Sequence, residues 1–418
     1  MGTTLRLAVG FLLLAAPLRA ADLRVTCYAD GNECDVLRQL AAPFTSAHPG
    51  TTLTVDQVPY KTILESLPVQ LAAGNGPDIA RVTDFGTMSP YLLDIGPMLP
   101  DRDQWEKNYG STLGWMRTQP GDRGIYGLLS QLTITGLYVN ASLFEQANQP
   151  IPGPKATWDE WAATLQKVAK ATGVPYGMAW DRSGHRFAGP AISYGATYFD
   201  GDKPAVVDEG FKQAASRFVK WNADGTADRD VWAASGGGYR DAFEEFANGK
   251  IVGYLSGSWQ LSRMQKQIGD GFDWKAVPNP CGGAACSGMP GGAAYVALKT
   301  SKNPKDVAAF LDYLASEPVY RKMMELTVNV PANAALQTMP LDYDLSPAGK
   351  QAMQVFSQSA TALSPVAYKL QGYRYNRVLF DATADRLSQV IAGQISLDQA
   401  YERIASDVDA RLAAAQKK

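Results

Sequence analysis

Near the start of the chain, segments with the apolar spacing of a β-strand alternate with segments with the apolar spacing of an α-helix. Leu23–Tyr28 and Ile79–Val82 are short β-prone runs, and Thr52–Val58 alternates between polar and apolar residues as a strand does. Between these runs, Glu33–Ala47 and Lys61–Ala73 place apolar residues at the spacing of a helix face. Strands that alternate with helices predict parallel strands covered by helices, so the expected fold class is α/β.

The same alternation returns further along the chain. Gly136–Asn140 reads as a strand, and a helix is expected to begin at Thr157, where Thr157 and Glu160 have the spacing of a capping box. Gly173 should end that helix. Later segments are assigned in the same way: helices at Tyr239–Ala247 and Asn303–Leu314, a strand at Ile251–Leu255, glycine-rich loops at Ser235–Gly238 and Cys281–Gly292, and an almost entirely helical tail at Pro347–Ala415.

Length and charge limit the class of protein. A chain of 418 residues is expected to form more than one core, most simply two. The formal net charge is −2, from 39 Lys and Arg against 41 Asp and Glu, so no excess of basic charge points to nucleic acid as a partner. The two histidines, His48 and His185, leave little room for histidine-based metal or triad chemistry. We expect no metal and no cofactor.

The first twenty residues, Met1–Ala20, have the pattern of a secretory signal peptide. Arg6 precedes the apolar stretch Leu7–Pro17, and a small residue, Ala20, marks the expected cleavage point. The alternative is a buried N-terminal strand or helix. Cys27 lacks the small-residue context of a lipid attachment site, so we expect a soluble exported product.

Four cysteines fall in two close pairs. In an oxidising compartment neighbouring cysteines usually pair, which predicts the disulfides Cys27–Cys34 and Cys281–Cys286. A four-cysteine zinc site is the alternative, although zinc sites usually have shorter spacing. Sequence alone does not decide among the three possible pairings.

Several enzyme motifs are absent from the sequence. It has no phosphate-binding G-x-x-x-x-G-K-[ST] loop, no H-E-x-x-H and no G-x-S-x-G. Paired carboxylates for glycoside hydrolysis are recognised by their separation in space, so an exported glycoside hydrolase stays open as an alternative.

Four segments in order resemble the carbohydrate-type extracellular solute-binding proteins of ABC importers, family 1, the maltose-binding-like family. The segments are Leu71–Ile79 with Asp84, Gly136–Asn140 with Thr157–Glu160, Phe243–Trp259, and Gly291–Ala297 with Ala308–Leu314. The stretch Gly372–Arg374 is most similar to the glycerol-3-phosphate-binding branch of the family.

The resemblance implies a two-lobed periplasmic-binding-protein fold of type II, with a hinge of crossover segments and a helical C-terminal tail. Lobe 1 would comprise residues 21–137 and 289–337, and lobe 2 residues 138–288 and 338–418. Such a protein is a monomer in the periplasm that binds a carbohydrate or polyol conjugate in the cleft between the lobes. It delivers this ligand to the permease subunits of an ABC transporter in the inner membrane and catalyses no reaction.

The candidate ligand residues follow from strand ends and from the matching segments. Tyr28 and Asp30 come after the first strand, and Asp84 after the strand Ile79–Val82, where ligands bind in open α/β sheets. Trp and Tyr, which number 9 and 19 against 14 Phe, combine a flat apolar surface with a polar group. The remaining candidates are Thr133, Trp180, Asp181, Ser256, Gly257, Ser258, Trp259, Gly291, Gly292, Tyr373 and Arg374.

Arg374 decides between two ligand classes. A guanidinium holds paired oxygen atoms in a fork, which suits a phosphate or sulfonate as well as sugar hydroxyls. The alternative to a neutral carbohydrate is therefore an anionic glycerol phosphate or a sulfonated sugar derivative.

Trp259→Ala and Asp84→Ala are each expected to weaken ligand binding by more than about tenfold, since one removes a stacking surface and the other a hydroxyl acceptor. Titrations of intrinsic tryptophan fluorescence measure both. Parent-like affinity in both variants would place the cleft elsewhere.

Overall fold

The computed structural model describes residues 21–117, 119, 121–233 and 238–415. The expected signal peptide Met1–Ala20 lies outside the described residues, as does 235–237 of the glycine-rich stretch Ser235–Gly238. The strands are β1 (Ala21–Cys27), β2 (Thr51–Gln57), β3 (Ile79–Val82), β4 (Gly127–Asn140), β5 (Tyr176–Trp180), β6 (Phe199–Asp200), β7 (Lys203–Pro204), β8 (Ile251–Gly257), β9 (Trp274–Val277) and β10 (Pro290–Ala297).

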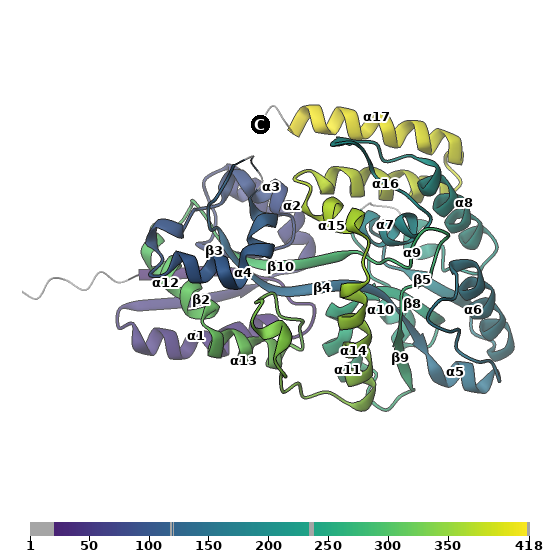
Figure 1. Ribbon diagram of the computed structural model, residues 1–418, viewed down its shortest axis with the longest axis horizontal. Helices are drawn as coiled ribbons and strands as arrows, with labels where there is room; N and C mark the ends of the chain where they lie inside the picture. Colours follow the sequence, from purple (N-terminus) through teal and green to yellow (C-terminus); the bar gives the residue numbers. More distant parts are fainter. Residues whose placement is uncertain (1–20, 118, 120, 234–237, 416–418) are drawn as a thin grey trace, which may run out of the picture.

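Helices cover both ends of the elongated molecule (Figure 1). The first set is α1 (Glu33–Ala47), α2 (Tyr60–Ala72), α3 (Phe85–Met88), α4 (Arg102–Met116), α5 (Ala141–Gln146), α6 (Trp158–Thr172), α7 (Gly184–Ser193), α8 (Glu209–Ala223) and α9 (Asp230–Ala233). The second set is α10 (Phe243–Ala247), α11 (Leu261–Gln267), α12 (Pro304–Ala315), α13 (Glu317–Thr327), α14 (Pro347–Thr361), α15 (Pro365–Gly372), α16 (Asn376–Ile391) and α17 (Leu397–Ala415). Short 3₁₀ turns lie at Ser89–Tyr91, Gly96–Met98, Ser258–Gln260 and Leu336–Thr338.

The main sheet has the strand order β2-β1-β3-β10-β4-β8-β5, with β9 also pairing to β4. β1 is parallel to β2 and β3, and β5 is parallel to β8, as the alternating pattern predicted. β10 runs antiparallel to both β3 and β4. The expected α/β class is confirmed.

β4 is the strand that both halves of the sheet share. Its first part, Gly127–Ile134, pairs with β10, and its last part, Thr135–Asn140, pairs with β8 and β9. A third crossing segment joins it where the Leu132 N–H donates to the Val330 carbonyl. In Figure 1, β4 and β10 run side by side between the two ends of the molecule.

The buried apolar side chains form two clusters, in agreement with the two cores expected from chain length. The first cluster runs from Leu23 to Leu129 and from Ala293 to Leu336. The second takes up the chain at Ile134 and includes the helical tail as far as Leu412. The change of cluster along β4 falls a few residues before the lobe boundary expected at residue 137.

Local details follow the sequence where they depend on neighbouring residues. The helix expected over Glu33–Ala47 has those bounds. Thr157 and Glu160 form the capping box of α6, and Gly173 ends that helix with a left-handed backbone at φ 73°.

Two assignments differ from the structure because distant contacts override the local pattern. The helix expected from Tyr239 begins only at Phe243, because Asp181 accepts hydrogen bonds from the Tyr239 hydroxyl and the Ala242 N–H. Gly291 and Gly292 were expected in a loop but belong to β10. A Cβ atom on Gly292 would lie 2.5 Å from the Gln131 carbonyl, so only glycine lets the two crossing strands approach so closely.

Both expected disulfides, Cys27–Cys34 and Cys281–Cys286, are present. The first joins the end of β1 to the start of α1. Among the described residues, we find no helix with the length and apolarity needed to span a membrane.

The double variant Cys27→Ala/Cys34→Ala is expected to lose about 2–3 kcal/mol of unfolding free energy, because an open ring gives the unfolded chain more entropy. Urea denaturation followed by circular dichroism measures this loss. The matched comparison is Cys281→Ala/Cys286→Ala, which opens a disulfide ring of similar size whose cysteines are more exposed. An unchanged urea midpoint in the first variant would contradict the expectation.

Candidate functional site

A cavity lies between the two apolar clusters, where strands from both halves end. It contains about 790 Å³ of space free of protein atoms, solvent-open space included. It is lined by residues that follow β1, β2, β3, β5 and β8, by the crossing strands and by the tail. These residues are Tyr28, Asp30, Tyr60, Thr83, Asp84, Gln131, Thr133, Ser183, His185, Arg186, Tyr239, Trp259, Gly291, Gly292, Gln371, Asn376, Arg377 and Phe380.

A fully buried guanidinium organises the wall that β1 provides. Arg81 of β3 donates to the Tyr28 carbonyl over 2.9 Å, and its guanidinium carbon lies 4.1 Å from the centre of the Tyr28 ring. The Arg81 Nη2 atom also lies 3.6 Å from Asp30 Oδ2 and 3.7 Å from Glu33 Oε1. Burial raises the pKa of Asp30, and the charge of Arg81 opposes that rise.

The segment that carries Tyr28 and Asp30 is held at both ends. It lies inside the short ring closed by the disulfide Cys27–Cys34. Within the ring, the Glu33 carboxylate accepts hydrogen bonds from the N–H groups of Asp30 and Gly31. These contacts fix the Asp30 carboxylate at the cavity edge.

Three tyrosines form an aromatic wall that spans both halves. The rings of Tyr28 and Tyr60 lie 4.7 Å apart, and the ring of Tyr60 meets that of Tyr239 edge-on at 5.5 Å. Tyr60 begins α2 in the first half, whereas Tyr239 precedes α10 in the second. The Tyr60 hydroxyl is hydrogen-bonded to Thr83 at 2.7 Å. This wall offers apolar ring faces beside hydroxyl groups.

A buried carboxylate organises the opposite wall. Asp181, which follows β5, is fully buried and accepts hydrogen bonds from the hydroxyls of Ser256, Tyr254 and Tyr239. Its Oδ2 atom also lies 3.4 Å from Arg186 Nε. Burial raises the pKa of Asp181, and the charge of Arg186 opposes this.

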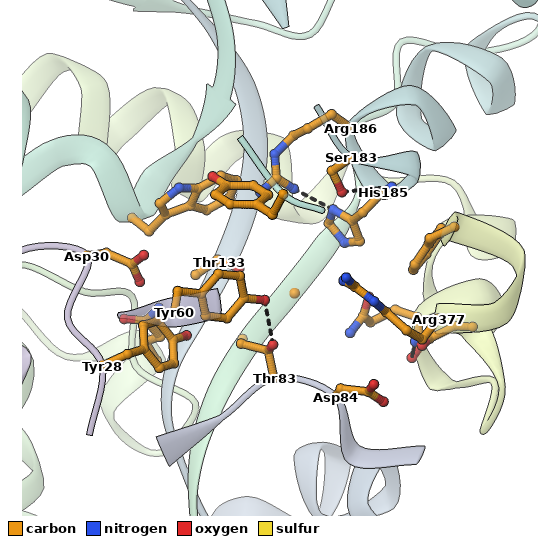
Figure 2. Close-up of a pocket in the computed structure, with 18 residues that line it drawn as sticks. Tyr28, Asp30, Tyr60, Thr83, Asp84, Thr133, Ser183, His185, Arg186 and Arg377 are labelled. Atoms are coloured by element: carbon orange, nitrogen blue, oxygen red, sulfur yellow. Dashed lines mark hydrogen bonds between the residues drawn. The ribbon is translucent and has the colours of Figure 1, made fainter. Parts of the chain in front are cut away.

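Arg186 connects that carboxylate to the cavity surface. Its guanidinium carbon lies 4.0 Å from the centre of the Trp259 ring, a cation–π arrangement. It also donates to His185 Nδ1 over 2.6 Å (Figure 2). Because arginine only donates, His185 Nδ1 must accept, and the proton on Nε2 is donated to the Pro290 carbonyl at 3.0 Å.

This contact makes His185 a neutral side chain. Burial, together with the neighbouring positive charge of Arg186, lowers the pKa of His185 to about 3. The imidazole therefore ties the second wall to the start of β10 without contributing a charge near neutral pH.

Two buried carboxamide oxygens in the cavity lining have no protein partner. They are Oε1 of Gln131, on β4, and Oε1 of Gln371, at the end of α15. Both side chains are more than nine-tenths buried, with 2% and 8% of their surface exposed. A buried acceptor without a partner is costly, so these atoms need a donor from whatever fills the cavity.

The C-terminal tail supplies the side of the cavity that faces Tyr28 and Asp30. Figure 2 shows Arg377, in the first turn of α16, reaching into the cavity from that side. Its Nε atom lies 3.0 Å from Asp381 Oδ1, which anchors the guanidinium. Asp84 lies below it in the same view and accepts a hydrogen bond from the Thr87 N–H as the cap of α3.

Seven of the residues singled out from the sequence line this cavity: Tyr28, Asp30, Asp84, Thr133, Trp259, Gly291 and Gly292. The structure brings them together from both halves of the chain. The other seven lie outside the lining: Trp180, Asp181, Ser256, Gly257, Ser258, Tyr373 and Arg374.

Packing explains why three of these seven lie behind the cavity wall. Trp180 stacks on Phe218 in the aromatic core, with ring centres 4.5 Å apart. Ser256 donates to Asp181, and both are fully buried. Asp181 and Ser256 thus support the residues that reach the cavity.

The other four are explained by their immediate contacts. Gly257 makes room for the Trp259 ring, with which a Cβ atom at this position would clash. The Ser258 hydroxyl accepts from the Ile134 N–H. Tyr373 packs edge-on against Phe199, and the guanidinium carbon of Arg374 lies 4.9 Å from the centre of the Tyr375 ring.

The sequence analysis missed several lining residues, and strand ends would have found some of them. Tyr60 follows β2 as Tyr28 follows β1, and Ser183, His185 and Arg186 follow β5. The rule that ligands bind at the carboxyl ends of parallel strands applies to each. Thr83, directly after β3, is found by the same rule. The others are Gln131, Tyr239, Gln371, Asn376, Arg377 and Phe380. Four of them come from the tail, whose folding back onto the cavity no local pattern reveals.

Nothing in the described part of the chain groups three or more His, Cys, Asp or Glu side chains as a metal site. The lining instead offers hydroxyl, carboxamide, carboxylate and guanidinium groups beside aromatic rings. Such a set binds a guest rich in hydroxyl groups.

Comparison with known proteins agrees with this geometry. Residues 30–320 match the model of the family described as bacterial extracellular solute-binding protein. A binding protein of Brucella abortus (strain 2308) is 22% identical over 413 residues, 97% of this chain and 96% of the relative. The arabinooligosaccharide-binding protein of Bacillus subtilis (strain 168) is 27% identical over 270 residues, 61% of this chain and 60% of the relative.

The fold also matches solved structures. An ABC substrate-binding protein from Listeria monocytogenes, solved in complex with cycloalternan, superposes with a TM-score of 0.79 at 16% identity. The match covers 94% of this chain and 99% of that protein. At this identity the likeness concerns the fold, and it confirms the expected two-lobed architecture with its helical C-terminal region.

His185 is expected to lower stability in acid. Its pKa of about 3 lies below the ordinary value of 6.5, so the unfolded chain binds a proton that the folded chain does not. The free energy of unfolding therefore decreases as the pH falls below 6.5, and at pH 5 the decrease is about 2 kcal/mol.

Urea denaturation at pH 7.5 and pH 5, in the parent and in His185→Gln, measures this cost as the difference between the two pH dependences. NMR of the imidazole carbons measures the pKa of His185 directly. The chain has only two histidines, so the signal that is missing in His185→Gln belongs to His185. An imidazole signal of His185 that titrates near pH 6.5 would contradict the neutral assignment.

Proposed function

Since the chain belongs to the family of bacterial extracellular solute-binding proteins, we propose that it is the periplasmic receptor of an ABC importer for a carbohydrate or polyol conjugate. The ligand is held in the cavity between the two halves and passed, chemically unchanged, to the permease subunits in the inner membrane. The receptor acts as a monomer and needs no cofactor.

The observation that carries this proposal is the pair of unpartnered acceptors on Gln131 and Gln371. They lie on the crossing strand and on the tail, so a guest that spans the cavity can donate hydroxyl groups to both. The aromatic wall of Tyr28, Tyr60 and Tyr239 suits the apolar C–H faces of a sugar ring. The names of the B. subtilis relative and of the L. monocytogenes complex also refer to oligosaccharides.

The two apolar clusters support a division into two lobes. We place residues 21–137 and 289–337 in lobe 1, and 138–288 and 338–418 in lobe 2. The cavity then lies in the cleft, and the crossing segments of β4, β10 and Val330 form the hinge. Closure of such a cleft buries the ligand and gives the permease a distinct form to recognise.

The charges of the lining favour a neutral ligand over an anionic one. Arg186 and Arg377 both face the cavity, but each already has a carboxylate partner, Asp181 and Asp381. Asp84 adds a negative charge to the same surface. A phosphate or sulfonate would have to compete with these carboxylates for the guanidinium groups, so the anionic derivatives remain the second choice.

Calorimetric titration of the purified protein with neutral and anionic sugars tests whether each class of sugar binds. Chromatography of the sugar after long incubation with the protein tests whether the sugar is hydrolysed. The proposal requires saturable, stoichiometric binding of a neutral sugar and its unchanged recovery. Release of hydrolysis products would make the protein a glycoside hydrolase, and binding confined to anionic sugars would favour the alternative ligand class.

Arg377→Ala is expected to weaken binding of the sugar found in that titration by about tenfold or more, equal to about 1.4 kcal/mol, because a charge-assisted hydrogen bond is lost. Arg374→Ala is the matched control, since Arg374 lies three residues away but outside the lining. It should change the affinity less than about twofold. A larger effect of Arg374→Ala than of Arg377→Ala would assign the ligand contact to Arg374.

A further inference from the structure

The two disulfides of the chain differ in their exposure to solvent. Cys27 and Cys34 are fully buried. Cys286, in contrast, is exposed, and its partner Cys281 is partly exposed. A thiolate must reach a sulfur atom to open a disulfide, so exposed disulfides are the ones that thiols reduce most readily in a folded protein. Of the two disulfides, Cys281–Cys286 is therefore the one open to such attack.

The ring that this disulfide closes is fastened to the C-terminal end of α7. The N–H groups of Ala284 and Ala285 both donate to the Ser193 carbonyl, over 2.9 and 3.1 Å. Gly282 packs on the same carbonyl, with which a Cβ atom on Gly282 would clash. The disulfide thus holds three residues of its ring against the last residue of the helix.

The segment that leaves the ring runs along α7. The Ser287 N–H donates to the Ser193 hydroxyl over 2.9 Å. About one turn earlier in the helix, the Gly288 backbone packs on Gly189, where a Cβ atom would lie 3.1 Å from the Gly288 Cα atom. All four residues are buried, so this segment and the helix form one closely packed unit.

The other end of this unit lies at the ligand cavity. His185 Nε2 donates to the Pro290 carbonyl over 3.0 Å, and both His185 and its neighbour Arg186 line the cavity. Gly291, the next residue of the segment, lines the cavity as well and belongs to the crossing strand β10. The disulfide therefore closes one end of a packed unit whose other end supplies three lining residues.

We propose that Cys281–Cys286 is a reducible disulfide that controls ligand affinity, with a dithiol as its reductant. In the oxidised protein the ring clamps α7, so the lining residues are held in place before a ligand arrives and less entropy is lost on binding. Reduction frees the ring, loosens the contact of α7 with Pro290 and lowers the affinity. The effect on affinity rests on the proposed function.

The thiol–disulfide exchange takes place in two steps. A thiolate of the dithiol attacks the exposed Cys286 Sγ, the S–S bond breaks, and Cys281 leaves as a thiolate that takes a proton from solvent. The second thiolate of the dithiol then attacks the dithiol sulfur bound to Cys286, and Cys286 leaves as a thiolate that is protonated in turn. The protein disulfide gains two electrons and two protons, and the dithiol is oxidised to its own disulfide.

Dithiothreitol treatment of the folded protein, followed by alkylation with iodoacetamide and peptide mass spectrometry, tests which disulfide opens. Cys281 and Cys286 should be labelled at a dithiothreitol concentration at least about tenfold lower than Cys27 and Cys34. Circular dichroism of the same samples reports whether the protein is still folded. Equal labelling of the two pairs, or labelling only after unfolding, would overturn the proposal.

NMR of the imidazole carbons tests the connection to the cavity without a ligand. Because an open ring changes the contact between His185 and Pro290, reduction should shift the His185 signals. His48, which follows α1 in the first half, is the internal control and should keep its signals. Cys281→Ser/Cys286→Ser should show the shifted signals without reductant and respond no further to it. Unchanged His185 signals in both proteins would contradict the connection.

Calorimetric titration with D-glucose, D-galactose, L-arabinose, maltose and lactose measures the effect on affinity. The reduced protein and the double serine variant should bind the accepted sugar about threefold or more weakly than the oxidised parent. Reoxidation of the parent with oxidised glutathione should restore its affinity. Equal affinity of the oxidised and reduced parent would overturn the control of affinity. Absence of binding by every sugar would instead count against the proposed function, because labelling and NMR test the disulfide without a ligand.

Discussion

The antiparallel pairing of β4 with β10 is the constraint on which the rest of the structure depends. Along this pairing, Thr133 faces Gly291 and Leu132 faces Gly292, at the level where one apolar cluster gives way to the other. The backbone of the two strands therefore both joins the halves and lines the cavity. Because buried backbone groups must stay hydrogen-bonded, the ladder fixes the cavity floor in one register.

Two buried charged side chains of opposite sign each hold one wall of the cavity in place. Arg81 lies behind Tyr28 and Asp30, and Asp181 lies behind Tyr239 and Arg186. Asp181 accepts several hydrogen bonds, whereas Arg81 donates one to the Tyr28 carbonyl and lies near the carboxylates of Asp30 and Glu33. These contacts offset the cost of removing a charge from water. The side chains that face the cavity are held by these contacts before any guest arrives, and less entropy is lost on binding.

The sequence predicted the features that depend on neighbouring residues: the α/β alternation, the capping box at Thr157, both disulfides, and the cavity residues directly after β1 and β3. It did not reveal contacts between distant segments. Arg374 was singled out from its motif, but α16 begins at Asn376 and turns Arg377 into the cavity instead. Asp181 was expected on the surface of the site, but its hydrogen bonds to Tyr254 and Ser256 hold it behind the wall.

The glycine pair in β10 has a consequence for how this receptor could evolve. A methyl group on Gly292 would meet the Gln131 backbone carbonyl, so this position does not tolerate divergence, whereas one on Gly291 would lie 2.8 Å from Thr133 Oγ1 and would require that side chain to move. The loops after the strands and the first turn of α16 carry no such steric restriction from the crossing ladder. A homologue that evolves a new ligand specificity would therefore change its loops and its tail and conserve the strands that form the cavity floor.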